Sequence, residues 1–283
     1  MAARRKMPDA VMLASELYNP FDLRRPSGIM SLDLYCGGGL PAGGLSQIDG
    51  KESVGKNWLL FQYMRQCQRI YGEKAAIAIA CFETALDKAF ARQCGVNIAY
   101  AEYEIEAINR KRKEDGLGPI PKAEVELMQQ QLGVFVVLRG EMEATLDNVL
   151  SLTGSNAYQI IGVDSWDSML PAEEEEKSMA KVPKVAVQAG MHTNFMHKLH
   201  ATMNRRVDNK ENETTIIGIR QVRQDLKAGP YQRDWASKGA CALKHGKLVD
   251  ITLIPGKSIV DGDKKKVGKF VNWEITKGKA GCH

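Results

Sequence analysis

The stretch QIDGKESVGKNWLL, residues 47–60, decides the fold class that we predict for this chain. It has the form of a phosphate-binding loop, in which two glycines separated by four residues are followed by lysine and then by serine or threonine. Gly50, Gly55 and Lys56 match this pattern, whereas Asn57 stands where a hydroxyl side chain is expected. An apolar strand leads into the loop and a helix pattern begins at Lys56, an order that turns backbone N–H groups and the positive end of a helix towards an anion. The alternative interpretation is a glycine turn with a purely structural role.

Short apolar runs and helix-like stretches alternate along much of the chain. The runs are continuously apolar, which is typical of strands covered on both faces of a parallel sheet, and they lie at residues 45–50, 75–83, 134–140, 158–165 and 214–221. The helix-like stretches lie at residues 56–70, 85–94, 142–152 and 185–206. This alternation predicts an α/β fold with a mostly parallel twisted sheet flanked by helices.

Three segments stand apart from this alternation. KLVDITLIPG (247–256) and KFVNWEITKGK (269–279) are predicted as two strands around the turn-like DGDKKK, and we expect them to form an antiparallel C-terminal extension of the sheet. Residues 101–131 lack a strong apolar rhythm and are predicted as a surface insertion, a helical hairpin broken by prolines. Residues 1–25 are too short for a domain, and we expect an oligomerisation arm with one helix around residues 10–18.

Composition narrows the class of protein. The chain has 283 residues, of which 44% are hydrophobic and 26% charged, as in an ordinary globular protein. It has no apolar run of the roughly 20 residues that a membrane helix needs, and we expect no secretory signal because no long apolar core follows the basic N-terminus. Its six cysteines form no C-x-x-C pair, so neither a zinc site nor a disulfide framework is indicated. We therefore expect a cytoplasmic protein without a membrane partner.

The net charge of +5 is mild, but its distribution is uneven. Acidic residues cluster at 173–176, and lysines are concentrated in the last fifth of the chain. A basic face in that region suits phosphate, although a solvated lysine-rich surface explains the charge equally well.

Two acidic residues at strand ends are candidates for chemistry. Asp164 ends the run YQIIGVDS, so it is expected in the crevice at the carboxyl end of a parallel sheet, where it would hold Mg²⁺ through water. Glu83 ends AAIAIACFE and is expected within reach of an attacking water. The alternatives are an exposed strand-end aspartate and a glutamate that stabilises a helix N-terminus.

Several segments, in order, resemble the RecA recombinases of bacteria and phages. They are PSGIMSLDLYCGGGLPAGGLSQIDGKESVGKN, FETALDKAFARQCGVNI, IIGVDSWDSMLP, IRQVRQ, GACALKH and WEITKGKAG. Together they span residues 26–281, and the arm and the 101–131 insertion lie outside the resemblance. The resemblance implies a RecA-like P-loop NTPase core over residues 26–283 that binds ATP and Mg²⁺.

The family resemblance also implies residue roles. The triphosphate would be bound by Gly50, Lys51, Glu52, Ser53, Val54, Gly55 and Lys56, and adenine by Asp87 and Phe90. Glu83 would activate water, while Asn57 and Asp164 would support the metal. Gln221 would sense the γ-phosphate, and Lys277 and Lys279 would reach the ATP of a neighbouring subunit, so that the site is complete only in an oligomer.

The segment after Gln221, VRQDLKAGPYQRDWASKGACAL, is the candidate DNA-binding loop. Basic groups alternate there with aromatic ones, a composition that suits a sequence-tolerant hold on single-stranded DNA; the candidates are Arg223, Lys227, Tyr231, Arg233, Trp235, Lys238 and Lys244. An ordinary solvated loop is the alternative, although such a loop rarely exposes tryptophan and tyrosine together. In a first loop, at residues 174–190, only Lys181 and Lys184 are candidates, because its acidic run would repel DNA.

Three features depart from the family pattern. Asn57 replaces the hydroxyl that binds Mg²⁺, and an amide oxygen differs in length and geometry. His245 stands where the family has an aromatic residue at the interface. The chain ends shortly after Lys279, so we expect no separate C-terminal domain, as in a compact phage recombinase or a truncated chain.

The function that we predict is a DNA-dependent ATPase that forms a helical filament on single-stranded DNA and promotes pairing and strand exchange with homologous duplex DNA. One alternative is a RecA-type ring motor or helicase core, although such motors use an arginine finger and this chain offers lysines. The other is an accessory paralogue that binds ATP but hydrolyses it weakly because of Asn57.

Overall fold

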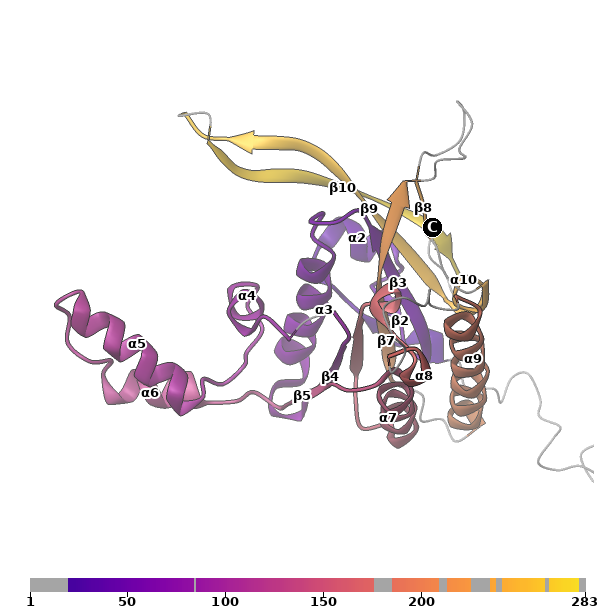
Figure 1. Cartoon of the computed structure of the whole chain (residues 1–283), viewed down its shortest axis with the longest axis horizontal. Coiled ribbons are helices and arrows are strands. Elements are labelled where there is room, and N and C mark those ends of the chain that lie inside the picture. The colour runs from indigo at the N-terminus through magenta and orange to yellow at the C-terminus, as the bar shows by residue number, and fades with distance from the viewer. Residues whose placement is uncertain are drawn as a thin grey trace, which may run out of the picture.

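The computed structural model describes residues 20–83, 85–175, 185–208, 213–224, 235–237, 241–262 and 265–279. Its centre is an eight-stranded sheet in the order β10-β9-β3-β7-β6-β4-β5, with β8 attached to β7 (Figure 1). The strands of this sheet are β3 (Gly44–Gly50), β4 (Ala76–Cys81), β5 (Val134–Leu138), β6 (Ile160–Asp164), β7 (Thr215–Gln224), β8 (Trp235–Ser237), β9 (Val249–Val260) and β10 (Lys266–Gly278). A small separate sheet pairs β1 (Arg24–Arg25) with β2 (Leu40–Pro41).

Along the order β9-β3-β7-β6-β4-β5, each pair of adjacent strands in the main sheet is parallel. The predicted fold class, a mostly parallel α/β sheet of the RecA type with antiparallel strands at its C-terminal end, is confirmed. One detail of the expectation was wrong, because of the two C-terminal strands β9 joins β3 in parallel, and it is β10 that pairs antiparallel, with β9. The chain reaches β9 through α10 (Cys241–Gly246), and this crossover lets β9 enter the sheet in the same direction as β3.

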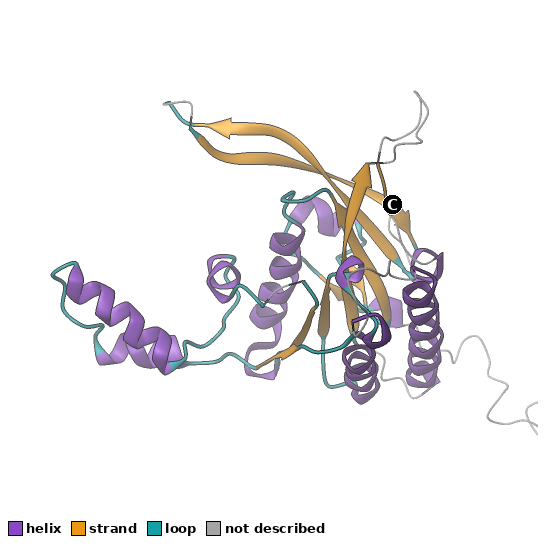
Figure 2. Cartoon of the chain, viewed as in Figure 1, coloured by secondary structure: helices purple, strands orange, loops and turns teal. Residues whose placement is uncertain are grey.

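Helices cover both faces of the sheet (Figure 2). On one face α3 (Lys56–Tyr71) packs its buried Leu60, Tyr63 and Met64 against the apolar side chains of the strands. On the other face α7 (Met142–Ser155) and α9 (Val185–Asp208) pack around Trp166, with Phe195 and Leu199 of α9 in contact with the same cluster. Strands that are buried on both faces have no need to alternate, which explains their continuous apolar runs.

The remaining helical elements connect or flank these layers. They are η2 (Pro20–Asp22), α2 (Met30–Tyr35), η3 (Gly72–Lys74), α4 (Lys88–Gln93), α5 (Glu102–Glu114), α6 (Lys122–Gln129), η4 (Trp166–Ser168) and α8 (Ala172–Glu175). Within the described residues, no helix combines the length and the apolar character that crossing a membrane requires. The arm helix expected around residues 10–18 lies outside the described residues.

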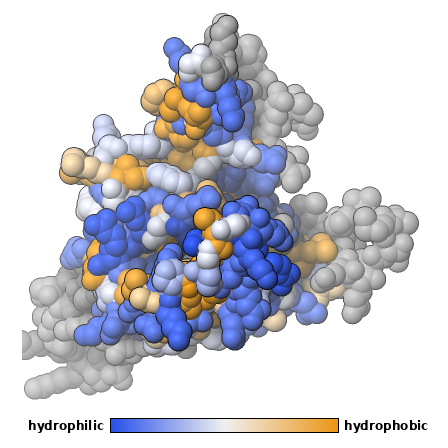
Figure 3. All heavy atoms as spheres, turned by 90° about the vertical axis from the view of Figure 1, so that its left-hand side faces the viewer, coloured by the Kyte–Doolittle hydropathy of each residue, from blue (hydrophilic) through white to orange (hydrophobic). Residues whose placement is uncertain are grey.

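Two structures project from the core. Helices α5 and α6 occupy the 101–131 segment and extend from the side of the sheet that ends in β5 (Figure 1). Arg92 of α4 anchors α5, because its Nη1 donates to Glu104 Oε1 at 3.0 Å. The molecular surface on this side is mainly hydrophilic, with separate apolar patches (Figure 3). The β9–β10 hairpin forms the second projection, since β9 pairs with β3 only over residues 249–253 and continues as a two-stranded ribbon.

Candidate functional site

The loop between β3 and α3 has the features of a phosphate cradle. A Cβ added at Gly50 would lie 2.6 Å from Val54 Cγ1, so the tight turn requires glycine there. Gly55, with φ +102°, stands at the N-cap of α3 and has open space beside it. No side chain caps the helix, so its first N–H groups are directed at any anion bound in the loop. Lys56 Nζ donates to the carbonyl of Lys51 at 2.8 Å, which holds the ammonium over the loop.

A pocket of about 350 Å³ opens at the carboxyl ends of β3, β4, β6 and β7. The loop and α3 contribute Glu52, Ser53, Gly55, Lys56, Asn57 and Trp58, and the other elements contribute Glu83, Phe90, Asp164, Ile219 and Gln221. The structure therefore brings together the predicted loop, both predicted strand-end acids and the predicted sensor. This convergence follows from the sheet order, because parallel strands present their carboxyl ends at one edge.

Asn57 and Asp164 form the corner of the pocket that fits a metal ion. Asn57 Nδ2 donates to Asp164 Oδ2 at 2.8 Å, so the amide oxygen of Asn57 is left for another partner. Burial, reinforced by Glu83, raises the pKa of Asp164 from 3.8 to about 6, whereas Asn57 and Lys56 oppose this rise. Burial lowers the pKa of Lys56, against the attraction of the acidic residues around it.

The donors in this corner suit Mg²⁺, which is usually held by one or two carboxylates together with substrate phosphates and water. Among the described residues, no group of three or more histidine, cysteine or acidic side chains could hold a metal ion by itself. The residues present therefore fit Mg²⁺ that arrives with a nucleotide better than a metal bound by protein alone.

Glu83 is the centre of a hydrogen-bond cluster. Its Oε1 accepts from Ser165 Oγ at 2.7 Å, from Ser168 Oγ at 2.9 Å and from Gln221 Nε2 at 3.1 Å. The backbone N–H of Gln221 donates to Asp167 Oδ2 at 2.8 Å. Glu83 and Gln221 are thus joined directly, and both are bonded to the turn that follows Asp164.

Sequence reasoning missed three members of this cluster: Ser165, Asp167 and Ser168. The available signal was their position, because DSWDS follows the strand end of Asp164 without interruption. Short polar side chains directly after a strand in the ligand crevice are candidates for positioning its acids. The sequence does not reveal which of them face Glu83 and which face β7.

The predicted adenine contacts have different surroundings. Asp87 is the N-cap of α4, where its Oδ1 accepts from the backbone N–H of Phe90 at 2.9 Å. This bond gives Asp87 a structural task that stabilises the start of the helix. Phe90 packs edge-on against Phe61, with ring centroids 5.8 Å apart, and its partly exposed ring lines the pocket.

Lys277 lies away from the pocket of its own chain. Its Nζ donates to the carbonyls of Lys244 and His245, at 2.8 and 2.9 Å, and so caps the C-terminal end of α10. Burial lowers the pKa of Lys277, and the nearby charges of Lys279 and Lys247 act in the same direction. Lys279 follows at the end of β10, where its backbone N–H donates to the carbonyl of Leu248 at 2.9 Å.

Of the candidate DNA-binding segment, residues 222–243, the structure describes 222–224, 235–237 and 241–243. Arg223 lies in β7 and Trp235 in β8, and these strands pair antiparallel with Gln224 opposite Trp235. Lys244 lies exposed in α10. Lys227, Tyr231, Arg233 and Lys238 lie outside the described residues, as do Lys181 and Lys184 of the first loop. The β7–β8 pairing shows that the segment leaves and rejoins the fold at one place, next to Gln221.

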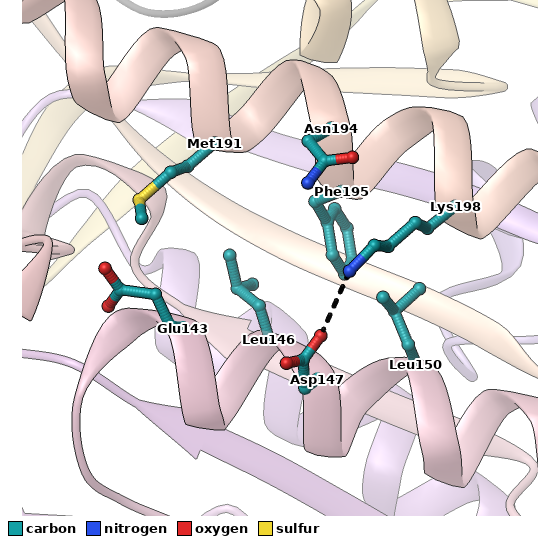
Figure 4. A pocket seen from close by; sticks show the side chains of 8 residues that line it. All are labelled: Glu143, Leu146, Asp147, Leu150, Met191, Asn194, Phe195 and Lys198. Atoms are coloured by element: carbon teal, nitrogen blue, oxygen red, sulfur yellow. Dashed lines mark ion pairs between the residues drawn. The ribbon is translucent and has the colours of Figure 1, made fainter.

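A second pocket, between α7 and α9, offers no comparable chemistry (Figure 4). Its volume is about 100 Å³, and Leu146, Leu150 and Phe195 form much of its wall. The charged pair at its mouth, Asp147 and Lys198, is 3.5 Å apart and largely exposed. The pocket beside the phosphate loop is therefore the better candidate for a nucleotide.

The strand order and the loop between β3 and α3 define the fold class of the protein: an α/β fold of the RecA-like type. Residues 11–102 match the RecA N-terminal domain family.

Comparison with individual proteins extends the match beyond that domain. The chain is similar to Protein RecA of Oleidesulfovibrio alaskensis, with 30% identity over 256 residues, 90% of this chain and 60% of that protein. The corresponding values are 29% over 255 residues, 90% and 59% for Protein RecA of Desulfovibrio desulfuricans, and 27% over 256 residues, 90% and 57% for that of Petrotoga mobilis. The chain thus spans less than two thirds of the length of these relatives. The resemblance to the RecA family is confirmed at low identity.

Proposed function

We propose that this protein is an ATP-dependent DNA recombinase that forms filaments on single-stranded DNA and promotes homologous pairing and strand exchange. The observation that carries the proposal is the joining of the acid and the sensor, in which Gln221 Nε2 donates to Glu83 Oε1 at 3.1 Å inside the pocket of the phosphate loop. The strand of Gln221, β7, continues directly into the basic and aromatic segment after it. A nucleotide in the pocket and DNA on that segment would therefore act on the same strand.

The residues of the pocket divide the work on ATP. The N–H groups at the start of α3 and the ammonium of Lys56 bind the triphosphate, while Asn57 and Asp164 orient the metal. Mg²⁺ held at this corner would neutralise charge that develops on the phosphates. Glu83 positions the attacking water and accepts its proton at Oε2, because Oε1 already accepts three hydrogen bonds.

Asn57 divides the two tasks of a hydroxyl between two atoms. A serine or threonine at this place would donate to Asp164 and ligate the metal with one oxygen. In Asn57 the amide nitrogen donates to Asp164 at 2.8 Å, and the amide oxygen remains for the metal. This arrangement supports a site that hydrolyses ATP. The second candidate function is an accessory paralogue with weak hydrolysis, because the side chain of asparagine is longer than that of serine or threonine.

The subunit interface would complete the site. Within its own chain Lys277 caps α10, so its contribution to ATP would be made to a neighbouring subunit, together with Lys279. A head-to-tail interface of this kind generates an open helical filament. We place the assembly in the cytoplasm, with the core from residue 26 onwards, the arm before it and the 101–131 insertion on its surface.

The test measures single-stranded DNA binding at low salt with a non-hydrolysable ATP analogue, with ADP and without nucleotide. We expect the analogue to strengthen binding, binding to weaken with salt, and filaments to appear in electron micrographs. Lys56→Ala is expected to abolish the nucleotide effect, and Lys111→Ala, on the exposed insertion, is the matched control. Absence of DNA binding at low salt would exclude the proposal, and closed rings would indicate a motor instead.

A further inference from the structure

Two charged residues lie directly behind the proposed sensor. Asp167, in the η4 turn, accepts the backbone N–H of Gln221 at its Oδ2, and its Oδ1 lies 3.9 Å from Arg220 Nε. Arg220 precedes Gln221 in β7 and is 2% exposed. Asp167 and Arg220 are not among the described residues that line the nucleotide pocket, so their contribution would be made through Gln221.

The position of Asp167 follows from the way β6 ends. The pairing of β6 with β7 reaches Val163 opposite Gly218, and the chain then turns into η4. Beyond this point the carboxylate of Asp167 supplies an acceptor to β7. Trp166 fixes the turn, because its fully buried ring packs against His192 and Phe195.

The positive charge of Arg220 stabilises the carboxylate of Asp167 in this position. A buried guanidinium requires an opposite charge nearby, and removal of that charge is costly. Nε and Nη2 of Arg220 have no hydrogen-bond partner among the described residues, and Asp167 is the acidic residue in ion-pair distance of Nε. The attraction therefore holds the carboxylate against β7, where it also meets the N–H of Gln221.

Gln221 is consequently held at two points by one turn. Its backbone is bonded to Asp167, and its side chain is bonded to Glu83, which Ser165 and Ser168 of the same turn also bind. Any movement of Gln221 towards a bound nucleotide must break the bond to Glu83 while the backbone bond to Asp167 resists or guides the movement of the strand.

We propose that Asp167, held in place by Arg220, is a positioning residue that sets the resting place of Gln221 and thereby the coupling between nucleotide and the DNA-binding segment after β7. The inference rests on the proposed function, and it adds a pair of residues that the chemistry of ATP does not itself require.

The experiment uses the full chain with Asp167→Ala and Asp167→Asn, and Asp147→Ala as the control. Asparagine keeps an oxygen that accepts the N–H of Gln221, alanine does not, and Asp147 is an exposed aspartate in α7. Three quantities are measured: the affinity for a fluorescent ATP analogue, the ratio of single-stranded DNA affinities with ATP analogue and with ADP, and amide hydrogen exchange of the peptide spanning residues 215–224.

Asp167→Ala is expected to reduce the DNA-affinity ratio about tenfold, a size typical of coupling between sites. Exchange at Gln221 is expected to accelerate in that variant. Asp167→Asn keeps the acceptor for the Gln221 N–H but loses the charge that Arg220 attracts, so its ratio and its protection are expected to lie between those of Asp167→Ala and the unmodified protein, and Asp147→Ala is expected to change neither. The affinity for the ATP analogue is expected to change less than about threefold, because Asp167 lies outside the pocket lining.

Two results overturn the inference and are distinguishable from each other. If the unmodified protein binds DNA equally with both nucleotides, the proposed function fails and this inference fails with it. If the unmodified protein responds to nucleotide and Asp167→Ala responds to the same extent, or loses nucleotide and DNA affinity in equal proportion, only the positioning role is excluded.

Discussion

Any side chain at Gly218, in the central strand β7, is expected to reduce the stability of the folded protein. A Cβ at this position would lie 1.9 Å from Nε1 and 2.7 Å from Cε2 of Trp166, which is closer than packed atoms approach. Trp166 is 1% exposed, and His192 and Phe195 pack against its ring at centroid distances of 5.7 and 5.6 Å. Because the ring has no free space to enter, Gly218→Ala must displace either β7 or the turn that carries Trp166.

The magnitude follows from this geometry. Overpacking costs about 1–3 kcal/mol, and the very short approach places Gly218→Ala near the upper end. Alanine also restricts the unfolded chain, which offsets about 0.4–1 kcal/mol of the loss. The expected net loss is about 2 kcal/mol. At about 2–4 °C per kcal/mol for domains of 150–250 residues, the melting temperature falls by about 4–8 °C.

Thermal unfolding followed by circular dichroism tests this prediction against a matched glycine. Gly162, in the adjacent β6, would bring a Cβ within 2.7 Å of the terminal methyl of Met64, the flexible end of a side chain. Gly162→Ala is therefore expected to cost less than about 1 kcal/mol.

A variant in which the indole is removed, Trp166→Leu, separates the steric conflict at Gly218 from other effects of the alanine. Trp166→Leu leaves a cavity beside β7, and Gly218→Ala fills part of it, so the alanine is expected to be neutral or stabilising there. Equal losses for the two glycines, or the same loss at Gly218 with and without Trp166, would refute the steric reasoning.

Three further predictions concern the site and its surroundings. The Asn57→Thr variant is expected to hydrolyse ATP faster than the unmodified protein, because a hydroxyl is the usual Mg²⁺ ligand at this place. A steady-state rate of phosphate release from the unmodified protein that equals or exceeds that of the variant contradicts this. Burial and the charge of Arg220 lower the pKa of His192 from 6.5 to about 4. Between these values only the unfolded chain is protonated, so His192 contributes a stability that rises with pH from about 4 to about 6.5, by about 3 kcal/mol in total. In urea titrations across this range, the free energy of unfolding of the unmodified protein is expected to gain on that of His192→Phe as pH rises, a difference in which the opposite contribution of Asp164, whose pKa is raised to about 6, cancels. Glu104→Ala removes the acceptor of both terminal nitrogens of Arg92, at 3.0 and 3.2 Å, and faster protease cleavage between α5 and α6 is the expected result.

The sequence predicted those parts of the fold that depend on local patterns. The four predicted helices are present at α3, α4, α7 and α9, and the five predicted apolar strands are β3 to β7. The direction of β9 was not predictable from its own residues, because it depends on the route through α10. Strand direction is set by the connection, whereas strand existence is set by the residues.

Some residues of the site were likewise predictable from the sequence, and others depended on the three-dimensional path of the chain. Glu83 follows β4, Asp164 ends β6, and Gln221 lies where the pairing of β7 with β3 ends, so their convergence followed from topology alone. The partners of Glu83 did not, because two serines separated by two residues reach one carboxylate oxygen only when the turn between them is fixed in space. Asp87 is predicted as an adenine contact, but an aspartate directly before a helix is also a typical N-cap, and the structure shows Asp87 capping α4.

The turn from Asp164 to Ser168 explains why packing and chemistry are linked in this protein. Asp164 is bonded to Asn57, the two serines are bonded to Glu83, and Asp167 is bonded to Gln221, whereas Trp166 belongs to the hydrophobic cluster that includes residues of the sheet and of α9. The indole therefore fixes the place from which the other four residues act. A substitution that moves Trp166 would displace the partners of Asn57, Glu83 and Gln221 together, although Trp166 is not among the residues that line the pocket. Loss of coupling in Gly218→Ala at temperatures where the protein remains folded is the consequence that separates this account from a simple loss of stability.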